Sequence, residues 1–344
     1  MKFAVSTALI FFSVCIVTGF SQMILPDLKG RPSAAQSGSD TYKSQLSGCL
    51  GAHQNGEKWK VHITNNETFR HTTSVKPNIF TQLKDEANQV RTLRKTPHST
   101  LHKSGARVAD APVITRNFRG NTRDNSVPMD NSMAISRNGF IVSGINSNII
   151  FTGPDGKITY NGGLSDFFTL LSLSTRMYDP RVIYDSEANR FIFMCLHGSE
   201  PSNTFLCLAF SKTEDPNGEW FYYKVDGNPS GDNHWFDYPN IALSSHDFYI
   251  AGLMRDTPGD WKYSVVYQLD KNDGYLGKEL RWKYYNEINN ADGEPAFNLV
   301  PTQSGWSTLI SPGMYFVSNV PTGGNKYNLY YTTGTLEDLS LIHI

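Results

Sequence analysis

The stretch "YDPRVIYDSEANRFIFMCLH", residues 178–197, predicts two consecutive strands joined by a turn. A strand-like run at residues 181–184 meets a polar turn at 185–190, and the apolar run that follows contains no polar residue before His197. A strand with one face in water alternates apolar and polar residues, whereas a continuous apolar run of this length is typical of a strand buried on both faces. We therefore expect a hairpin whose second strand is covered by neighbours on two sides.

The same pair of strands recurs along the chain. The second strand of the pair reads "GFIVSGI", "RFIFMCL", "DFYIAGL" and "GMYFVSN", starting at Gly139, Arg190, Asp247 and Gly313. The strand before it reads "DNSMAIS", "DPRVIYD", "DYPNIAL" and "AFNLVPT", starting at Asp130, Asp179, Asp237 and Ala296. Three of the four units continue with a third strand, a hairpin turn and a fourth strand.

Four strands per unit, at spacings of about 50 to 65 residues, are the layout of a β-propeller blade. The predicted fold class is therefore all-β, a β-propeller with about four four-stranded blades at residues 128–177, 178–235, 236–294 and 295–338. The alternative is a β-sandwich with long hairpins, but a sandwich predicts no common repeat.

Residues 1–22 have the pattern of a secretory signal peptide, with Lys2 before the apolar stretch "FAVSTALIFFSVCIVTGF" and a small-residue exit. The apolar run is close to the length of a membrane span, so an uncleaved membrane anchor is the alternative. Residues 23–111 are polar, which predicts a leader or linker with at most one short helix, in "KPNIFTQLKDEANQVRTLRK". We expect the mature protein to be exported and soluble.

Composition argues against several classes of partner. Charged residues make up 18% of the 344 residues and the net charge is −1, so no overall field favours nucleic acid or an anionic membrane. The four cysteines match neither a disulfide framework nor a zinc pattern. If the hairpin of the second unit centres near Pro201, Cys195 and Cys207 lie opposite each other, either as a cross-strand disulfide or as two buried thiols.

The run "PVITRNFRGN…VPMDNSMAISRNGFIVSGINSNIIF" and the later "YDPRVIYDSEANRF", "AFSKTEDPNGEW" and "WFDYPNIAL" resemble secreted β-propeller proteins of Bacteroidetes. The resemblance extends from residue 113 to about residue 338. It implies export to the cell surface or medium by the type IX secretion system, through a C-terminal sorting domain that is missing from this sequence.

The last six residues, "LSLIHI", match the in-frame translation of a transposase adaptor used in preparing sequencing libraries. We therefore interpret residues 339–344 as an artefact and the chain as truncated. Because propellers close with about four to eight blades, we expect an incomplete ring here and about six to eight blades in the intact protein.

A weaker resemblance is to sialidase-type propellers, whose Asp-box lies in the hairpin between the third and fourth strands of a blade. "TEDPNGEW", residues 213–220, occupies that place with Asp215, Gly218 and Trp220, but its glycine is one position late and Glu219 replaces the threonine. An Asp-box is a folding element. The resemblance therefore implies an aspartate bonded to the turn backbone and a tryptophan packed beneath it, and it implies no catalysis.

Three acidic residues, Asp130, Asp179 and Asp237, open the first strand of three units, and the first strand of a blade lines the central channel. They are candidates for oxygen ligands of Ca²⁺ or of a polar ligand, with Arg181 further inside. The alternative is that each aspartate caps the turn that enters its strand. Arg181 is the only arginine in these strands, so the arginine triad of a sialidase has no support.

The loop "GDNHWFDYP", residues 231–239, is the stretch most typical of a ligand site. His234, Trp235 and Tyr238 are candidates for stacking on a sugar or peptide, with Asp237 accepting hydrogen bonds. The alternative is an aromatic plug packed between blades.

Asp270 and Asp273 in "LDKNDG" are weak candidates for calcium ligands. Their spacing departs from the calcium-loop pattern, and a plain hairpin is favoured. We expect no cofactor, with Ca²⁺ as the alternative.

The function predicted from these features is that of an exported, non-enzymatic binding or adhesion propeller for an extracellular glycan or protein. The alternative is a glycan-active hydrolase of the sialidase or another glycosidase type, with Asp179, Arg181 and Asp237 in the channel. No catalytic set is identified, because the separation of two carboxylates decides the mechanism of a glycosidase and is not readable from sequence.

Overall fold

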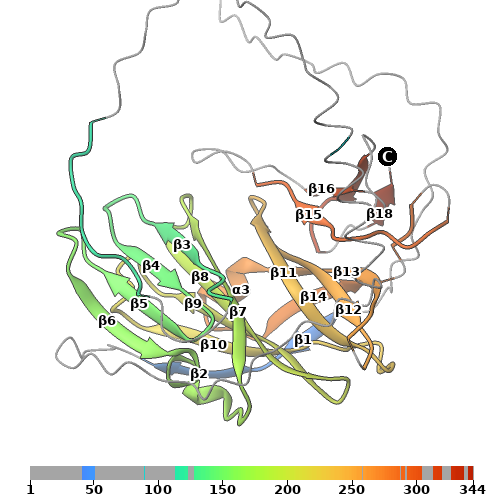
Figure 1. The fold of residues 1–344 in the computed structure, drawn as a ribbon, viewed down its shortest axis with the longest axis horizontal. Coiled ribbons are helices and arrows are strands. Elements are labelled where there is room, and N and C mark those ends of the chain that lie inside the picture. Colours follow the sequence, from blue (N-terminus) through green and yellow to red (C-terminus); the bar gives the residue numbers. More distant parts are fainter. Residues whose placement is uncertain are drawn as a thin grey trace, which may run out of the picture. The chain divides into compact units, whose positions relative to one another are not determined.

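The structure is a computed structural model that describes residues 41–50, 89, 113–122, 128–257, 259–286, 288–290, 293–303, 313–319, 327–336 and 340–343. The chain divides into two compact units, residues 1–31 and 32–344, and all described residues belong to the second. They form four antiparallel β-sheets (Figure 1), which confirms the predicted all-β class. No described helix is long and apolar enough to cross a membrane.

Each sheet contains four strands that are consecutive along the chain. The first sheet contains β3 (Ser132–Ile135), β4 (Ile141–Gly144), β5 (Asn148–Thr152) and β6 (Ile158–Gly163). The second contains β7 (Met177–Asp185), β8 (Arg190–Glu200), β9 (Asn203–Ser211) and β10 (Trp220–Asp226). The third contains β11 (Trp235–Leu243), β12 (Asp247–Arg255), β13 (Trp261–Asp270) and β14 (Leu280–Tyr285). The fourth contains β15 (Val300–Pro301), β16 (Met314–Asn319), β17 (Tyr327–Thr333) and β18 (Ser340–His343).

Short helices occupy two of the connections. They are α2 (Leu164–Phe167) and η1 (Thr169–Leu171) after the first sheet, and α3 (Lys271–Tyr275) between β13 and β14. β18 lies within the segment "LSLIHI" and pairs with β17. The interpretation of that segment as an artefact stays a prediction, and the proposed signal peptide lies outside the described residues.

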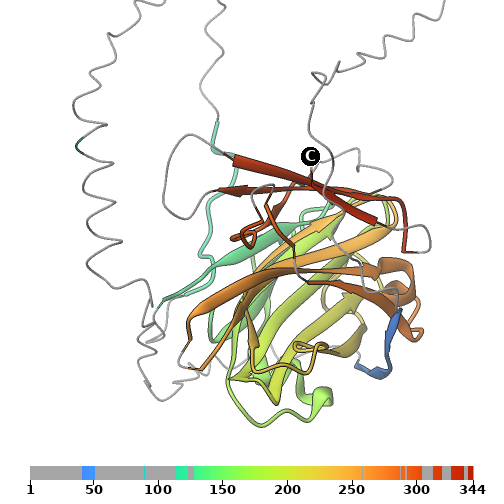
Figure 2. The same ribbon diagram turned by 90° about the vertical axis from the view of Figure 1, so that its right-hand side faces the viewer.

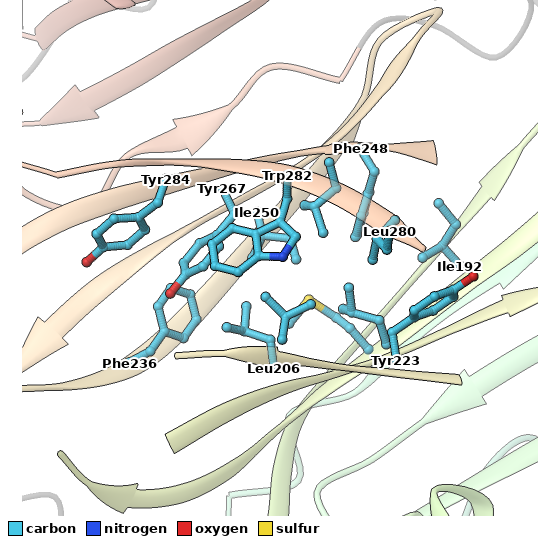
Figure 3. Close-up of a cluster of buried hydrophobic side chains, with 14 of the residues drawn as sticks. Ile192, Leu206, Tyr223, Phe236, Phe248, Ile250, Tyr267, Leu280, Trp282 and Tyr284 are labelled. Atoms are coloured by element: carbon cyan, nitrogen blue, oxygen red, sulfur yellow. The ribbon is translucent and has the colours of Figure 1, made fainter. Parts of the chain in front are cut away.

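The first strands of consecutive sheets are neighbours: β3 contacts β7, β7 contacts β11, and β11 contacts β15. One cluster of buried side chains fills the space between the first and second sheets, and another lies between the second and third (Figure 3). A third cluster joins the third sheet to the fourth, whose dark red strands lie next to the orange strands of the third in Figure 2. The sheets therefore stack face to face around their first strands.

β8 is covered on both faces, as its continuous apolar sequence predicts. Ile192, Met194 and Leu196 point into the cluster shared with the third sheet. Phe191 and Phe193 point into the cluster shared with the first sheet. Full burial of such a side chain contributes about 1.5–3 kcal/mol relative to exposure, so this strand stabilises two interfaces at once.

An ion pair ties the end of β7 in the second sheet to the helix α3 of the third sheet. Lys271 Nζ lies 2.8 Å from Asp185 Oδ2, and both side chains are almost completely buried. The Lys271 ammonium also donates to the carbonyl oxygen of Ser244 at 2.9 Å, and the Tyr275 hydroxyl donates to Asp185 Oδ2 at 2.9 Å. A buried pair is stabilising only when further hydrogen bonds satisfy both partners, and here they do.

Two strands lie where the sequence predicted none. β1 (Tyr42–Ser44) pairs with β14, and β2 (Leu46–Leu50) pairs with β10. The prediction of a leader or linker with at most one short helix across residues 23–111 is therefore wrong for residues 42–50. These strands are short and half polar because one face of each is exposed to water, so their apolar content is too low to signal strands. Of the region expected to hold a helix, only Gln89 is described, and it is helical.

Replacing Lys271 by methionine is expected to lower the free energy of unfolding by about 3–5 kcal/mol, because it leaves the Asp185 carboxylate buried without its counter-charge. Urea denaturation measures this loss. The matched control is Lys157→Met, which breaks an exposed pair with Asp155 at 3.3 Å and is expected to cost less than about 1 kcal/mol. Equal effects of the two substitutions would show that the buried pair does not join the sheets.

Candidate functional site

Four residues bend the chain at the start of the four first strands, and we call them the inner-strand bends. Asp130, Asp179, Tyr238 and Asn298 have φ angles of 42°, 50°, 59° and 49°. Aspartate and asparagine tolerate this left-handed region, whereas a bulky side chain there is an outlier. Tyr238 is therefore the exception among the four, and this residue is 47% exposed.

The prediction that Asp130, Asp179 and Asp237 are equivalent positions at the start of three first strands is wrong for Asp237. In β7 the register shifts between Tyr178 and Arg181, and in β11 it shifts between Asp237 and Asn240. Asp237 is thus the counterpart of Tyr178, and Tyr238 is the counterpart of Asp179. Alignment of the prolines that follow the two bends, in "YDPR" and "DYPN", carries this signal in the sequence.

Side-chain hydrogen bonds link the bends of neighbouring sheets. Asn146, in the turn between β4 and β5, donates through Nδ2 to Asp130 Oδ2 at 2.7 Å. Its Oδ1 accepts the backbone N–H of Asp179, also at 2.7 Å. Arg181 Nε donates to the carbonyl oxygen of Pro239 at 2.7 Å. Asn146 was missed by the sequence analysis, because it belongs to a turn of a different sheet from the residue that it holds.

Asp237 is removed from solvent by an ion pair. Its side chain is buried, and Arg255 Nε lies 2.5 Å from Asp237 Oδ2. Arg255 also donates through Nη1 to the carbonyl oxygen of Gly259 at 2.8 Å. The predicted role of Asp237 as an open hydrogen-bond acceptor is therefore wrong, because its carboxylate is occupied by Arg255.

Asp179 has a different environment. Burial, together with the negative charges of Asp237 and Asp130, raises the pKa of its carboxyl to about 7 against the opposing effect of Arg181 and Arg176. No described residue donates a hydrogen bond to this carboxylate, and its side chain is half-buried. Asp179 is therefore an acid that changes its protonation near neutral pH and keeps its oxygen atoms available.

The three aspartates do not assemble a metal centre. Within the described part of the chain, no group of three or more His, Cys, Asp or Glu side chains is arranged to hold a metal ion. The alternative interpretation, that each aspartate side chain caps its turn through nearby backbone N–H groups, stays a prediction: the Asp130 carboxylate accepts from the Asn146 side chain, and Asp179 donates to Asn146 through its own backbone N–H.

The loop at residues 231–239 separates into inward and outward residues. Trp235 is buried and donates through Nε1 to the carbonyl oxygen of Asp256 at 3.1 Å. His234 Nδ1 lies 2.8 Å from Asp232 Oδ2, and its ring meets the ring of Tyr263 edge-on. Trp235 therefore belongs to the packed interior, as the plug interpretation expects, and Tyr238 is the aromatic residue of this loop that is about half exposed.

The Asp-box-like turn joins β9 to β10. Asp215 Oδ1 accepts the backbone N–H of Asn217 at 3.0 Å, and the backbone N–H of Gly218 donates to the Asp215 carbonyl oxygen at 3.1 Å. Trp220 is fully buried and donates through Nε1 to the carbonyl oxygen of Pro216 at 2.7 Å. These contacts lie within the turn, so the structure gives these residues a local folding role.

The weak calcium candidates bind an arginine instead. Arg281 Nε lies 2.6 Å from Asp273 Oδ2, and the Arg281 guanidinium also pairs with Asp270. Asp270 Oδ1 accepts the backbone N–H groups of Asn272 and Asp273, which caps the helix α3. The segment joins the antiparallel strands β13 and β14, as the predicted hairpin requires, and its connection contains one helical turn. Aspartate and asparagine favour caps and turns alike, so its residues suit both forms of connection.

Cys195 and Cys207 are directly opposite each other in the pairing of β8 with β9. Both are buried free thiols in the structure, and burial raises the pKa of the Cys195 thiol well above its ordinary value. A protonated thiol is a poor nucleophile. Both side chains pack in the core between the first and second sheets.

No family model and no curated protein matches the chain. Among solved structures, the fold is similar to endo-1,5-alpha-L-arabinanase from Thermotoga petrophila RKU-1, with 11% sequence identity and a TM-score of 0.27. The match covers 62% of this chain and 63% of that chain.

The titration of Asp179 predicts a pH dependence of stability. Its pKa is about 7 in the folded protein and 3.8 in the absence of perturbation, so the folded state binds the proton more tightly. The free energy of unfolding therefore falls through this group as the pH rises from about 4 to about 7. Urea denaturation across this range is expected to show a wild-type curve that falls relative to that of Asp179→Asn. The pKa of Asp247 is raised as well, but this residue is present in both proteins, so its contribution cancels in the difference between the two curves. A difference independent of pH would contradict the assignment.

Proposed function

We propose that the protein is an exported β-propeller module that binds a glycan at the inner-strand bends. The observation that carries the proposal is the placement of Tyr238, an aromatic residue that is 47% exposed and has a left-handed backbone, at the bend next to that of Asp179. Sugar ligands are bound by an aromatic face together with a few polar groups that fix their orientation. The half-buried Asp179 carboxyl is a group of that kind.

Strain supports a binding role for Tyr238. The equivalent positions of the other sheets carry aspartate or asparagine, which adopt the left-handed conformation at lower cost. Backbone strain of this type is concentrated at functional sites. The neighbouring Asn240 donates through Nδ2 to Asn298 Oδ1 at 3.4 Å, so the bend is also held from the fourth sheet.

The propeller architecture is proposed from the contacts between first strands, which place the starts of all four sheets around one region. Propellers close with about four to eight sheets, and a ring of about six to eight, of which this chain carries four, completes the proposal. The exposure of Met133 and Ile135 on β3 supports an open ring, because a sheet face inside a closed ring is covered.

The location proposed is the cell surface or the medium. It is supported by the signal-like pattern of residues 1–22 and by the resemblance to secreted Bacteroidetes propellers exported by the type IX secretion system. Extracellular glycans and glycoproteins are the ligands present there.

A glycoside hydrolase is the second candidate, favoured by one observation. Asp179 and Asp237 lie in unlike environments, the first with a pKa raised to about 7 and the second paired with Arg255. In glycosidases, two carboxyl groups in unlike environments have different pKa values, so that one stays protonated as the acid while the other is ionised. The burial of Asp237 beneath Arg255 favours binding over hydrolysis, because a catalytic carboxylate has to reach water or the sugar.

A glycan array screened with the full chain is expected to identify a ligand whose binding is weakened about tenfold or more by Tyr238→Ala, since an aromatic contact and its buried area are lost. Asp179→Asn tests the polar contact. Tyr327→Ala is the matched control, because Tyr327 is another exposed tyrosine, on the fourth sheet, and its loss is expected to leave binding unchanged.

Chromogenic glycosides test the second candidate in the same preparations. The proposal expects no turnover. Turnover that is abolished by Asp237→Asn would replace binding by hydrolysis as the function of this face.

A further inference from the structure

The outer edges of the second and third sheets are occupied by one short piece of the chain, residues 42–50, which we call the strap. β1 extends the third sheet by pairing antiparallel with β14, and β2 extends the second sheet by pairing antiparallel with β10. Only Gln45 separates the two strands. Figure 1 shows both, in blue, on the outer side of the sheets that they join.

Alternate side chains of the strap point toward the sheets. Tyr42, Ser44, Leu46 and Gly48 are buried or half-buried, whereas the residues between them are exposed. This period of two is that of a strand with one covered face. The second and third sheets therefore contact the strap through its side chains as well as through its backbone.

The first half of the strap recognises Trp282. The Tyr42 ring stacks on the Trp282 ring with centroids 4.5 Å apart, and the Trp282 Nε1 donates to Ser44 Oγ at 3.0 Å. Lys43 points the other way, and its ammonium lies 2.7 Å from a carboxylate oxygen of Glu279 on the surface. Tyr42 and Ser44 thus carry the specific contacts of β1.

The second half of the strap depends on a close approach. Leu46 packs against the cluster between the second and third sheets. A Cβ atom at Gly48 would lie 2.9 Å from Leu170 Cδ1, so the end of the Leu170 side chain would have to move, and the Gly48 φ of 153° is a conformation that other residues rarely adopt. Position 48 therefore selects glycine.

We propose that the outer edges of β14 and β10 form one strand-acceptor site, that residues 42–50 are its ligand, and that the strap stays bound when the chain between Leu50 and the first sheet is cut. The described contacts of the strap are made with β10, β14, η1 and the neighbours of these elements, so binding does not require the covalent link. Strand addition supplies affinity through main-chain hydrogen bonds and specificity through alternate side chains. Residues 42–50 of the predicted leader are thus part of the folded protein.

Insertion of a sequence-specific protease site after Gly56 in the full chain tests the proposal. After cleavage, the fragment that ends at the inserted site is expected to co-elute with the remainder in size-exclusion chromatography under native conditions and to separate from it in guanidinium chloride. Separate elution under native conditions would overturn the proposal.

Synthetic peptides test the specificity without altering the folding of the chain. A peptide of residues 41–50 is expected to displace the labelled N-terminal fragment from the cleaved protein. The Gly48→Val form is expected to compete about tenfold more weakly, because valine is strained at a φ of 153° and its side chain meets Leu170, and the Tyr42→Ala form about tenfold more weakly.

Lys43→Ala is the matched control, since the Lys43 ammonium forms only an exposed ion pair, and it is expected to compete within about twofold of the wild-type peptide. Equal competition by the Gly48→Val peptide would contradict a specific site.

Discussion

The coverage of β8 and β12 on both faces is the constraint on which the rest of the structure depends. Phe248 and Ile250 of β12 pack toward the second sheet, while Tyr249 and Ala251 pack toward the fourth. A strand with no face in water holds its two neighbours at the distance that packing allows, because interiors are close-packed. Each sheet is therefore positioned by the next one, without a separate core for each.

This stacking brings the first strands together and places the inner-strand bends in one region. Side chains can differ between the bends, because Asn146 bonds to the backbone N–H of Asp179 and Arg181 bonds to the carbonyl oxygen of Pro239, next to Tyr238. Function can vary at such positions while the scaffold stays constant, as it does where loops are carried by rigid elements. Asp179 and Tyr238 are the variations that give this face its acid and its aromatic ring.

The second strands were predictable from sequence because a continuous run of apolar residues is stable only where both faces of the strand are buried. The register of the first strands was not, since Asp237 and Tyr238 differ from Tyr178 and Asp179 in type, and only the following prolines align. The ion pair of Asp237 with Arg255 depends on a contact between adjacent strands that no local pattern shows. The strap was missed for a related reason: the partners of its side chains, Trp282 and Leu170, are distant in sequence, and its own sequence is half polar.

Hydrogen exchange resolved by segment tests the stacking of the sheets most directly. Amides in the interiors of β8 and β12 are expected to exchange only through global unfolding, with the free energy measured by urea denaturation, because both faces of these strands are covered. Amides of β3, whose Met133 and Ile135 side chains are exposed, are expected to exchange through smaller openings. Exchange of β8 or β12 at free energies well below that of global unfolding would contradict the account, since it would mean that neighbouring sheets separate independently.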